Sequence, residues 1–149
     1  MSFVDNLDIN RLAIVLIEFQ NEFATEGGKL HEPVKPVMDS SNMLQNSAKT
    51  VAFARSKGAK IFHVPITFSD QYKEVSSSPY GILAGVKESK CFPASDWGGR
   101  ICDAMTPSPE DVIVEGKKGL CGFYSTNLDF LLRQNGVDTI ALAGFLTNW

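Results

Sequence analysis

The stretch LAIVLIEF, residues 12–19, decides the fold of this chain, because every residue in it except Glu18 is apolar. A short and continuous apolar run is typical of a strand that is buried on both faces, as in a parallel sheet. Three later runs have the same character: KIFHVPI (60–66), DVIVE (111–115) and TIALA (139–143). The sequence therefore predicts four buried parallel strands.

Helical patterns lie between these runs. SSNMLQNSAKTVAFARSKG (40–58) repeats apolar residues at three-to-four spacing and ends on a glycine. STNLDFLLRQNG (125–136) is a shorter version, with Ser125 or Thr126 as its N-cap. A third, weaker helix is expected at 98–105, before the proline-rich TPSPED.

The alternation of strands and helices predicts an α/β fold: a three-layer α/β/α, doubly wound and mainly parallel sheet of Rossmann-like type. The 149 residues are enough for a single domain. A doubly wound sheet needs helices on both faces, yet GFLTNW (144–149) follows the fourth strand and ends the sequence. We therefore expect residues 1–149 to form one domain that lacks its C-terminal strands and helices, through truncation or because the next residue is a modified one.

One long irregular segment, residues 67–96, separates the second strand from the weak helix. A segment of this length is typical of a lid, a binding loop or an oligomer contact. The alternative is a disordered surface insertion. Its four aromatic residues, Phe68, Tyr72, Tyr80 and Phe92, argue against a plain linker.

The composition excludes several classes of partner. The net charge is −3, and no cluster of basic residues is longer than Lys117–Lys118, so we expect no nucleic-acid binding. The N-terminal residues are acidic, and the apolar run from Leu12 to Ile17 is too short for a signal peptide or a membrane span. We therefore expect a cytoplasmic protein with no membrane partner.

Cysteines and histidines give no metal pattern. Cys91, Cys102 and Cys121 have no ligand spacing, and their odd number argues against a disulfide framework. His31 and His63 lie too far apart in sequence for a two-histidine zinc motif. We expect His63 to be a satisfied core or rim residue and His31 to be a solvated loop residue.

Polar residues follow the strands at the sheet edge where α/β proteins bind ligands. Glu18 ends the first strand, Lys117 and Lys118 follow the third, and the 144–149 turn follows the fourth. A buried carboxylate needs a partner, which favours a functional role for Glu18 over a solvated strand end. Solvated loop charges remain the alternative for the lysines. Cys121 is interpreted as a small packing residue under the following helix rather than as a nucleophile.

The order of short motifs resembles the isochorismatase-like cysteine hydrolases, a group that includes nicotinamidases, N-carbamoylsarcosine amidohydrolase and isochorismatases. The resemblance covers nearly the whole chain and rests on these segments: EFQNEF (18–23), GGKL (27–30), DWGGRICDAMTPSPEDVIVEGKKGLCGF (96–123), TNL (126–128) and GFLTNW (144–149). No single motif is specific, but together they occur in the family's order and at its spacing.

The resemblance implies a nucleophilic cysteine directly after Trp149, in the first turn of a helix. A helix N-terminus lowers the pKa of a thiol and can hold an oxyanion. The resemblance also implies that Glu18 is the base and that Lys117 is its charge partner. Lys117 is preferred to Lys118 because only Lys117 keeps the family's six-residue step to Phe123.

Further expectations follow from the same resemblance. Leu146 and Thr147 would form the oxyanion turn, joined by a non-proline cis peptide bond. Phe23, Trp97 and Phe123 are candidates for the wall of the substrate pocket, although each is equally compatible with a plain core position. A homo-oligomer is expected, with the long irregular segment as the contact.

This sequence departs from the family pattern at Glu18, where the family has aspartate. The metal ligands of nicotinamidases have no counterpart near GGKLHEP (27–33), so we expect neither a metal nor another cofactor. The function that the resemblance implies is hydrolysis of an amide-type C–N bond in a small molecule through a thioester-like intermediate. The alternative is an inactive binding or scaffold protein. A nucleotide-binding protein is disfavoured because no Gly-x-Gly-x-x-Gly turn follows the first strand.

Overall fold

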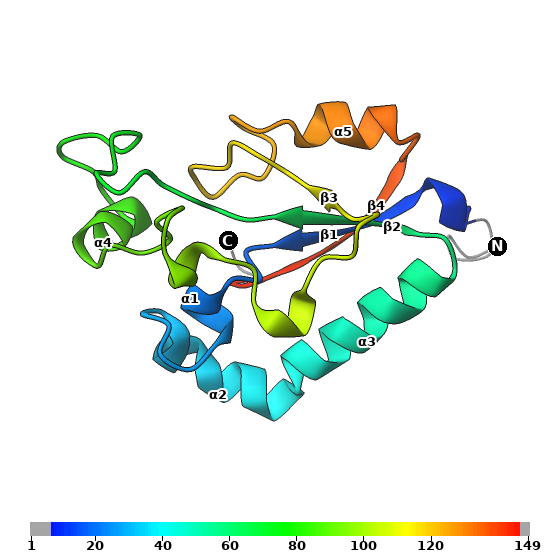
Figure 1. Cartoon of the computed structure of the whole chain (residues 1–149), viewed down its shortest axis with the longest axis horizontal. Coiled ribbons are helices and arrows are strands. Elements are labelled where there is room, and N and C mark those ends of the chain that lie inside the picture. The colour runs from blue at the N-terminus through cyan, green and yellow to red at the C-terminus, as the bar shows by residue number, and fades with distance from the viewer. Residues whose placement is uncertain (1–6, 147–149) are drawn as a thin grey trace.

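The computed structural model describes residues 7–146 and shows one four-stranded sheet (Figure 1). The strands are β1 (Leu12–Ile17), β2 (Lys60–Val64), β3 (Val112–Ile113) and β4 (Thr139–Gly144). Their order is β3-β2-β1-β4, and all neighbouring pairs are parallel. The four predicted strands are therefore confirmed.

Helices cover both faces of the sheet, which confirms the predicted α/β/α layers. The α-helices are α1 (Asn21–Ala24), α2 (His31–Ser41), α3 (Met43–Ser56), α4 (Ile82–Glu88) and α5 (Leu128–Gln134). Short 3-10 helices are η2 (Ile9–Arg11), η3 (Trp97–Gly99) and η4 (Asp103–Met105). Figure 1 shows α5 on one side of the sheet and α1, α2 and α3 on the other.

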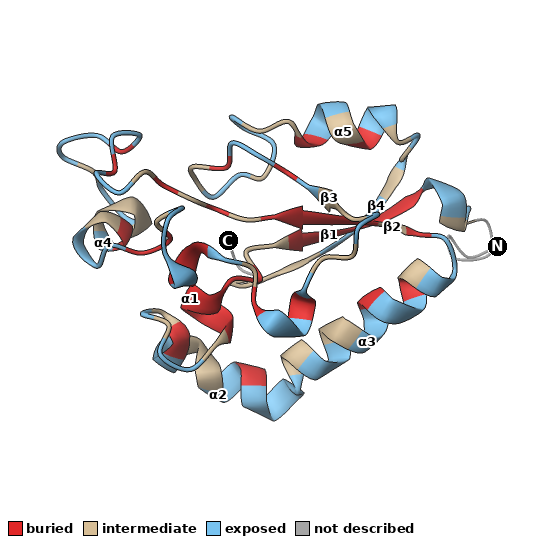
Figure 2. Cartoon of the chain, in the orientation of Figure 1, coloured by how far each residue is buried: buried red, intermediate tan, exposed pale blue. Residues whose placement is uncertain are grey.

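The sheet is buried on both faces, and this explains the uninterrupted apolar run of β1. Ile14 and Leu16 pack in the cluster that includes Val51 of α3, whereas Val15 packs with Leu128 and other residues of α5. Figure 2 shows β1 and β2 as the most deeply buried part of the sheet. Successive side chains of a strand point to opposite faces, so every position of β1 must be apolar.

Two helical predictions are confirmed and one is wrong. Segments 40–58 and 125–136 form α3 and α5. Segment 98–105 forms η3 and η4 instead of an α-helix. The backbone there pairs with the segment after β1: the Asn21 N–H donates to the Arg100 carbonyl (2.9 Å), and the Cys102 N–H donates to the Phe19 carbonyl (3.0 Å). Backbone groups that form these hydrogen bonds are not available for the hydrogen bonds of an α-helix.

Helix α2 was not predicted, because HEPVKPVMDSS carries two prolines that weaken the helical signal. Pro33 lies in the first turn, where the missing N–H is not needed, and Pro36 lies inside the helix. Asn42, in the left-handed conformation (φ 50°), ends α2 and precedes α3.

The irregular segment 67–96 is packed rather than disordered. It contains α4, and Phe68, Tyr72 and Phe92 lie buried with Phe23 in one cluster. The Tyr72 hydroxyl donates to the Cys91 carbonyl at 2.8 Å. Tyr80 is the exception among the four aromatic residues, with 92% of its surface exposed. The disordered alternative is therefore wrong, and a lid or oligomer role stays a prediction.

Across residues 7–146 the structure has no helix of the length and apolar character that a membrane crossing requires.

Candidate active site

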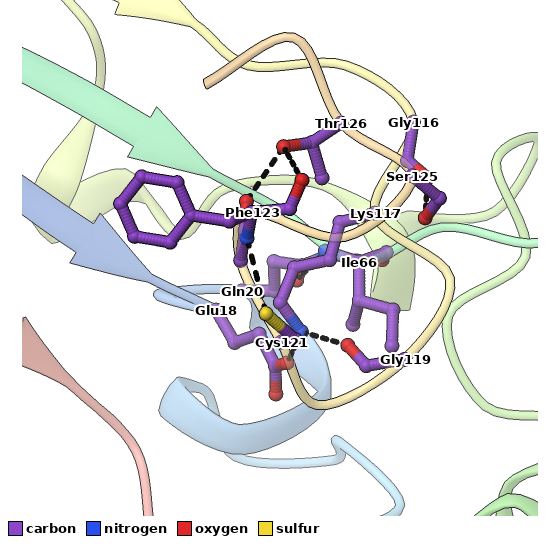
Figure 3. Close-up of polar contacts among 11 residues, drawn as sticks. Glu18, Gln20, Ile66, Gly116, Lys117, Gly119, Cys121, Phe123, Ser125 and Thr126 are labelled. Atoms are coloured by element: carbon purple, nitrogen blue, oxygen red, sulfur yellow. Dashed lines mark hydrogen bonds and ion pairs between the residues drawn. The ribbon is translucent and has the colours of Figure 1, made fainter. Parts of the chain in front are cut away.

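Glu18 leaves β1 in a conformation that is unusual for its residue type. Its φ is 59°, in the left-handed region, which is sparsely populated by residues other than glycine. The Glu18 N–H still donates to the Val64 carbonyl (3.2 Å), so the backbone turns directly at the sheet edge. The side chain is 13% exposed, and its carboxylate forms an ion pair with the Lys117 ammonium (Figure 3).

The turn that places Lys117 next to this carboxylate requires a glycine. Gly116 has a φ of 92°, and a Cβ there would lie 2.3 Å from the Ser125 carbonyl oxygen. The Lys117 side chain is fully buried, and its ammonium donates to Glu18 and to the Gly119 carbonyl. The solvated-loop alternative is wrong for Lys117, and a buried ammonium of this kind depends on its acidic partner.

Lys118 points to a different partner. Its ammonium donates to the Thr67 carbonyl and lies 3.3 Å from a carboxylate oxygen of Glu74, and about a third of its side chain is exposed. The structure thus brings Lys117, and not Lys118, to Glu18.

Cys121 lies on the loop after Lys117 and is exposed, so its interpretation as a packing residue under the next helix is wrong. Its sulfur accepts hydrogen bonds from the backbone N–H groups of Tyr124 and Phe123, both at 3.4 Å. These bonds, with the nearby charge of Lys117, lower the pKa of the thiol from its ordinary value. The start of helix α5 is stabilised by Thr126, whose hydroxyl accepts a hydrogen bond from the Leu128 N–H (3.2 Å).

The three aromatic candidates for the pocket wall lie in different surroundings. Phe123 is half exposed and lines an apolar cavity of about 240 Å³ beside the ends of β1 and β4. Phe23 is buried and stacks on Phe145, with ring centroids 5.0 Å apart. Trp97 lies in η3 and is 42% exposed. Of the three candidates Phe23, Trp97 and Phe123, the structure places only Phe123 at this cavity.

The turn after β4 begins next to Glu18. Gly144 is paired with Ile17, and a Cβ on Gly144 would lie 2.7 Å from the Cβ of Ile17. Leu146 lines the same cavity as Phe123 and has a φ of 58°. Thr147, and with it the expected cis peptide bond, lies outside the described residues.

Two buried polar residues of α1 and its N-cap were given no role by the sequence. Gln20 is fully buried and makes three side-chain hydrogen bonds. Glu22 is also buried, and its carboxylate accepts the backbone N–H groups of Lys29 (2.9 Å) and Phe92 (3.1 Å). The signal available was the unusual polarity of EFQNEF directly after a buried strand.

His31 is buried at the start of α2, so its prediction as a solvated loop residue is wrong. Its Nδ1 lies 2.9 Å from the Phe23 carbonyl oxygen, which ties α2 back to α1.

His63 lies in the core, as predicted, but only one of its ring nitrogens is satisfied. Its Nε2 lies 3.1 Å from Asp111, which also accepts from the Arg55 guanidinium (2.7 and 3.2 Å). Its Nδ1 is buried and has no partner within residues 7–146. Burial lowers the pKa of His63 below its ordinary value, although Asp111 acts in the opposite direction.

The His63 environment predicts that the protein loses stability under mild acid. The unfolded chain takes up a proton below about pH 6.5, whereas folded His63 stays neutral to a lower pH. The free energy of unfolding should therefore fall as the pH drops from about 6.5, by up to about 1.4 kcal/mol per pH unit. Urea unfolding between about pH 8 and pH 5 measures this slope.

His63→Gln is the control for this prediction, because its amide can still donate to Asp111 and cannot titrate. The pH slope in this window should be flatter in His63→Gln than in the wild type. Asp111 does not interfere: burial alone would raise its pKa, but hydrogen bonds from Arg55 and Ser108 hold that pKa below its ordinary value. Equal slopes in both proteins would assign the acid sensitivity to other groups.

In the described part of the chain, no group of three or more His, Cys, Asp or Glu side chains is arranged to hold a metal ion. The expected absence of a metal stays a prediction.

A parallel α/β sheet with a buried carboxylate–lysine pair at its carboxyl edge defines the class of protein. The family described as Isochorismatase domain matches residues 12–149, and the chain belongs to this family.

Individual relatives agree with this assignment. The ureidoacrylate amidohydrolase RutB of Methylorubrum extorquens strain AM1 is 27% identical over 95% of this chain. The solved structure of an N-carbamoylsarcosine amidase from Thermoplasma acidophilum is 27% identical, with a TM-score of 0.68 over 90% of this chain and 67% of that one. A cysteine hydrolase from Pseudomonas syringae pv. phaseolicola 1448A shares the fold, with a TM-score of 0.73 at 22% identity over 95% of this chain and 62% of that one. This chain spans 61% of the length of RutB.

Proposed function

We propose that this protein is a cysteine-dependent hydrolase that cleaves an amide-type C–N bond of a small molecule. The observation that carries the proposal is the buried Glu18–Lys117 ion pair at the edge of the sheet where β4 ends. The proposed nucleophile is a cysteine directly after Trp149. Strand β4 runs parallel to β1, and Gly144 at its end is paired with Ile17, the residue before Glu18.

The chemistry follows from the charges of the pair. The Glu18 carboxylate takes the thiol proton, and the thiolate attacks the amide carbon to give a tetrahedral intermediate. The protonated Glu18 then gives its proton to the leaving nitrogen as the C–N bond breaks, which leaves a thioester. Water attacks the thioester while Glu18 takes one of its protons; as the C–S bond breaks, Glu18 returns that proton to the departing thiolate, and the acid product is released. Lys117 stabilises the carboxylate and the developing negative charge.

Two named relatives support the bond type. RutB is a ureidoacrylate amidohydrolase, and the Thermoplasma protein is an N-carbamoylsarcosine amidase. Both names describe hydrolysis of a C–N bond next to a carbonyl group, so small amides and ureido compounds are the first substrates to test.

The test uses the full-length protein and has two readouts. Ammonia or amine release is measured on a panel of small amides and carbamoyl compounds, and thiol reactivity is measured with iodoacetamide at near-neutral pH by peptide mapping. We expect one fast-labelled cysteine directly after Trp149 and turnover of at least one substrate. The isosteric control Glu18→Gln removes the base and should abolish turnover. Slow labelling throughout, or fast labelling confined to Cys91, Cys102 or Cys121, would contradict the proposal.

The second candidate function is a binding or scaffold protein that keeps the fold without the chemistry. The observation that favours it is Glu18, which is one methylene longer than the family's aspartate. A wild type that turns over no substrate but binds a small amide would support it. Self-association and a cytoplasmic location stay predictions, and size-exclusion chromatography with light scattering tests the first.

A further inference from the structure

Gln20 has an unusual environment for an uncharged polar side chain. Gln20 is fully buried and lies two positions after Glu18 in the sequence. Its Nε2 donates to the carbonyl groups of Ile66 (2.8 Å) and Gly99 (2.7 Å), and its Oε1 accepts the Ile66 N–H (2.9 Å). One carboxamide therefore uses both donor hydrogens, and it joins the segment after β1 to the segment after β2 and to η3.

Further hydrogen bonds connect Gln20 to both Glu18 and Lys117. On one side, the Gln20 N–H donates to the Glu18 carbonyl at 2.7 Å, across the left-handed turn. On the other side, Ile66 is followed by Thr67, whose N–H donates to the Lys117 carbonyl (3.4 Å). Gln20 thus holds the backbone after β1, which carries Glu18, at a fixed distance from the backbone after β3, which carries Lys117. Figure 3 draws Gln20 and Ile66 together with Glu18 and Lys117.

We infer that Gln20 is a positioning residue that sets the geometry of the Glu18–Lys117 pair, and this inference rests on the proposed function. Glu18 has one more rotatable bond than the family's aspartate, so its carboxylate needs a more tightly fixed backbone to keep one orientation. A carboxamide with all its donors used provides such a fixed point. Misplacement by on the order of 1 Å is enough to lower catalysis strongly.

Gln20→Met tests this inference, because methionine keeps the length of the side chain and removes all three hydrogen bonds. Asn21→Leu is the matched control. Asn21 is buried in the next position and its side chain donates to the Trp97 carbonyl (3.0 Å), which also lies in η3. Within residues 7–146 its side-chain hydrogen bonds do not reach the segment after β2. We expect Gln20→Met to lower kcat by at least about 10-fold with KM within about 3-fold, and Asn21→Leu to leave kcat within about 3-fold.

A second readout does not depend on catalysis. Reductive methylation of the folded protein, read by peptide mass spectrometry, measures how often Lys117 becomes accessible, with the partly exposed Lys118 as internal reference. Lys117 should be methylated several-fold faster in Gln20→Met than in the wild type or in Asn21→Leu. If Gln20→Met does not fold, Gln20→Glu replaces it, since glutamate keeps the shape and the acceptor for Ile66 but loses the donors when ionised.

The outcomes separate this inference from the proposed function. Equal losses of kcat in both variants, with Lys117 equally protected, would show that Gln20 has only a structural role. Selective exposure of Lys117 in Gln20→Met supports the positioning role even if the wild type turns over no amide, in which case the proposed function alone fails.

Discussion

Lys117→Ala is expected to lower kcat/KM by at least about 10³-fold. The Lys117 ammonium is fully buried and forms an ion pair with Glu18, so alanine leaves the carboxylate with neither its counter-charge nor its donor. Removal of one member of a buried pair also costs about 3 kcal/mol of folding stability. Steady-state kinetics and urea unfolding measure the two effects separately.

Lys118→Ala is the matched control for this prediction. Lys118 is adjacent in sequence and has the same charge, but its ammonium contacts Thr67 and Glu74 at a partly exposed position. Its removal should change kcat/KM by less than about 5-fold and stability by less than about 1 kcal/mol. Similar losses in both variants would mean that the overall positive charge of the loop matters, and not the buried pair.

Glu18→Asp is expected to lower activity by about 10²-fold, although it restores the residue that is typical of the family. The left-handed backbone at Glu18 and the buried position of Lys117 together set the distance that the side chain has to span. Aspartate is shorter by one methylene and would withdraw the carboxylate from the ammonium by more than about 1 Å. Kinetic measurement of kcat and KM with the best substrate of the amide panel tests this.

Glu18→Gln provides the comparison, because it keeps the length and removes the charge. We expect Glu18→Asp to retain some activity and Glu18→Gln to retain none. If Glu18→Asp is as active as the wild type or more active, the site is not adjusted to glutamate, and the pair tolerates more than one geometry.

Much of the candidate site could be predicted from the sequence. The motif order led to Glu18 and Lys117 and to the preference over Lys118, and the structure brings the first two together. The burial of Lys117 and the contacts of Gln20 could not be predicted, because they depend on groups far away in the chain: the Glu18 carboxylate for Lys117, and the Ile66 and Gly99 carbonyls for Gln20. The exposure of Cys121 was not predicted either, because it depends on how the 116–122 loop turns rather than on residue type.

The sequence by itself determined the parallel sheet and its helical layers. Strands buried on both faces must be continuously apolar, and this local property can be recognised without knowledge of partners. Only the tertiary structure decided which polar groups are buried and paired. The Glu18–Lys117 ion pair and the three side-chain hydrogen bonds of Gln20 each join segments that follow different strands. The energy of a buried polar group depends on the partners that such packing supplies, and residue order alone does not specify them.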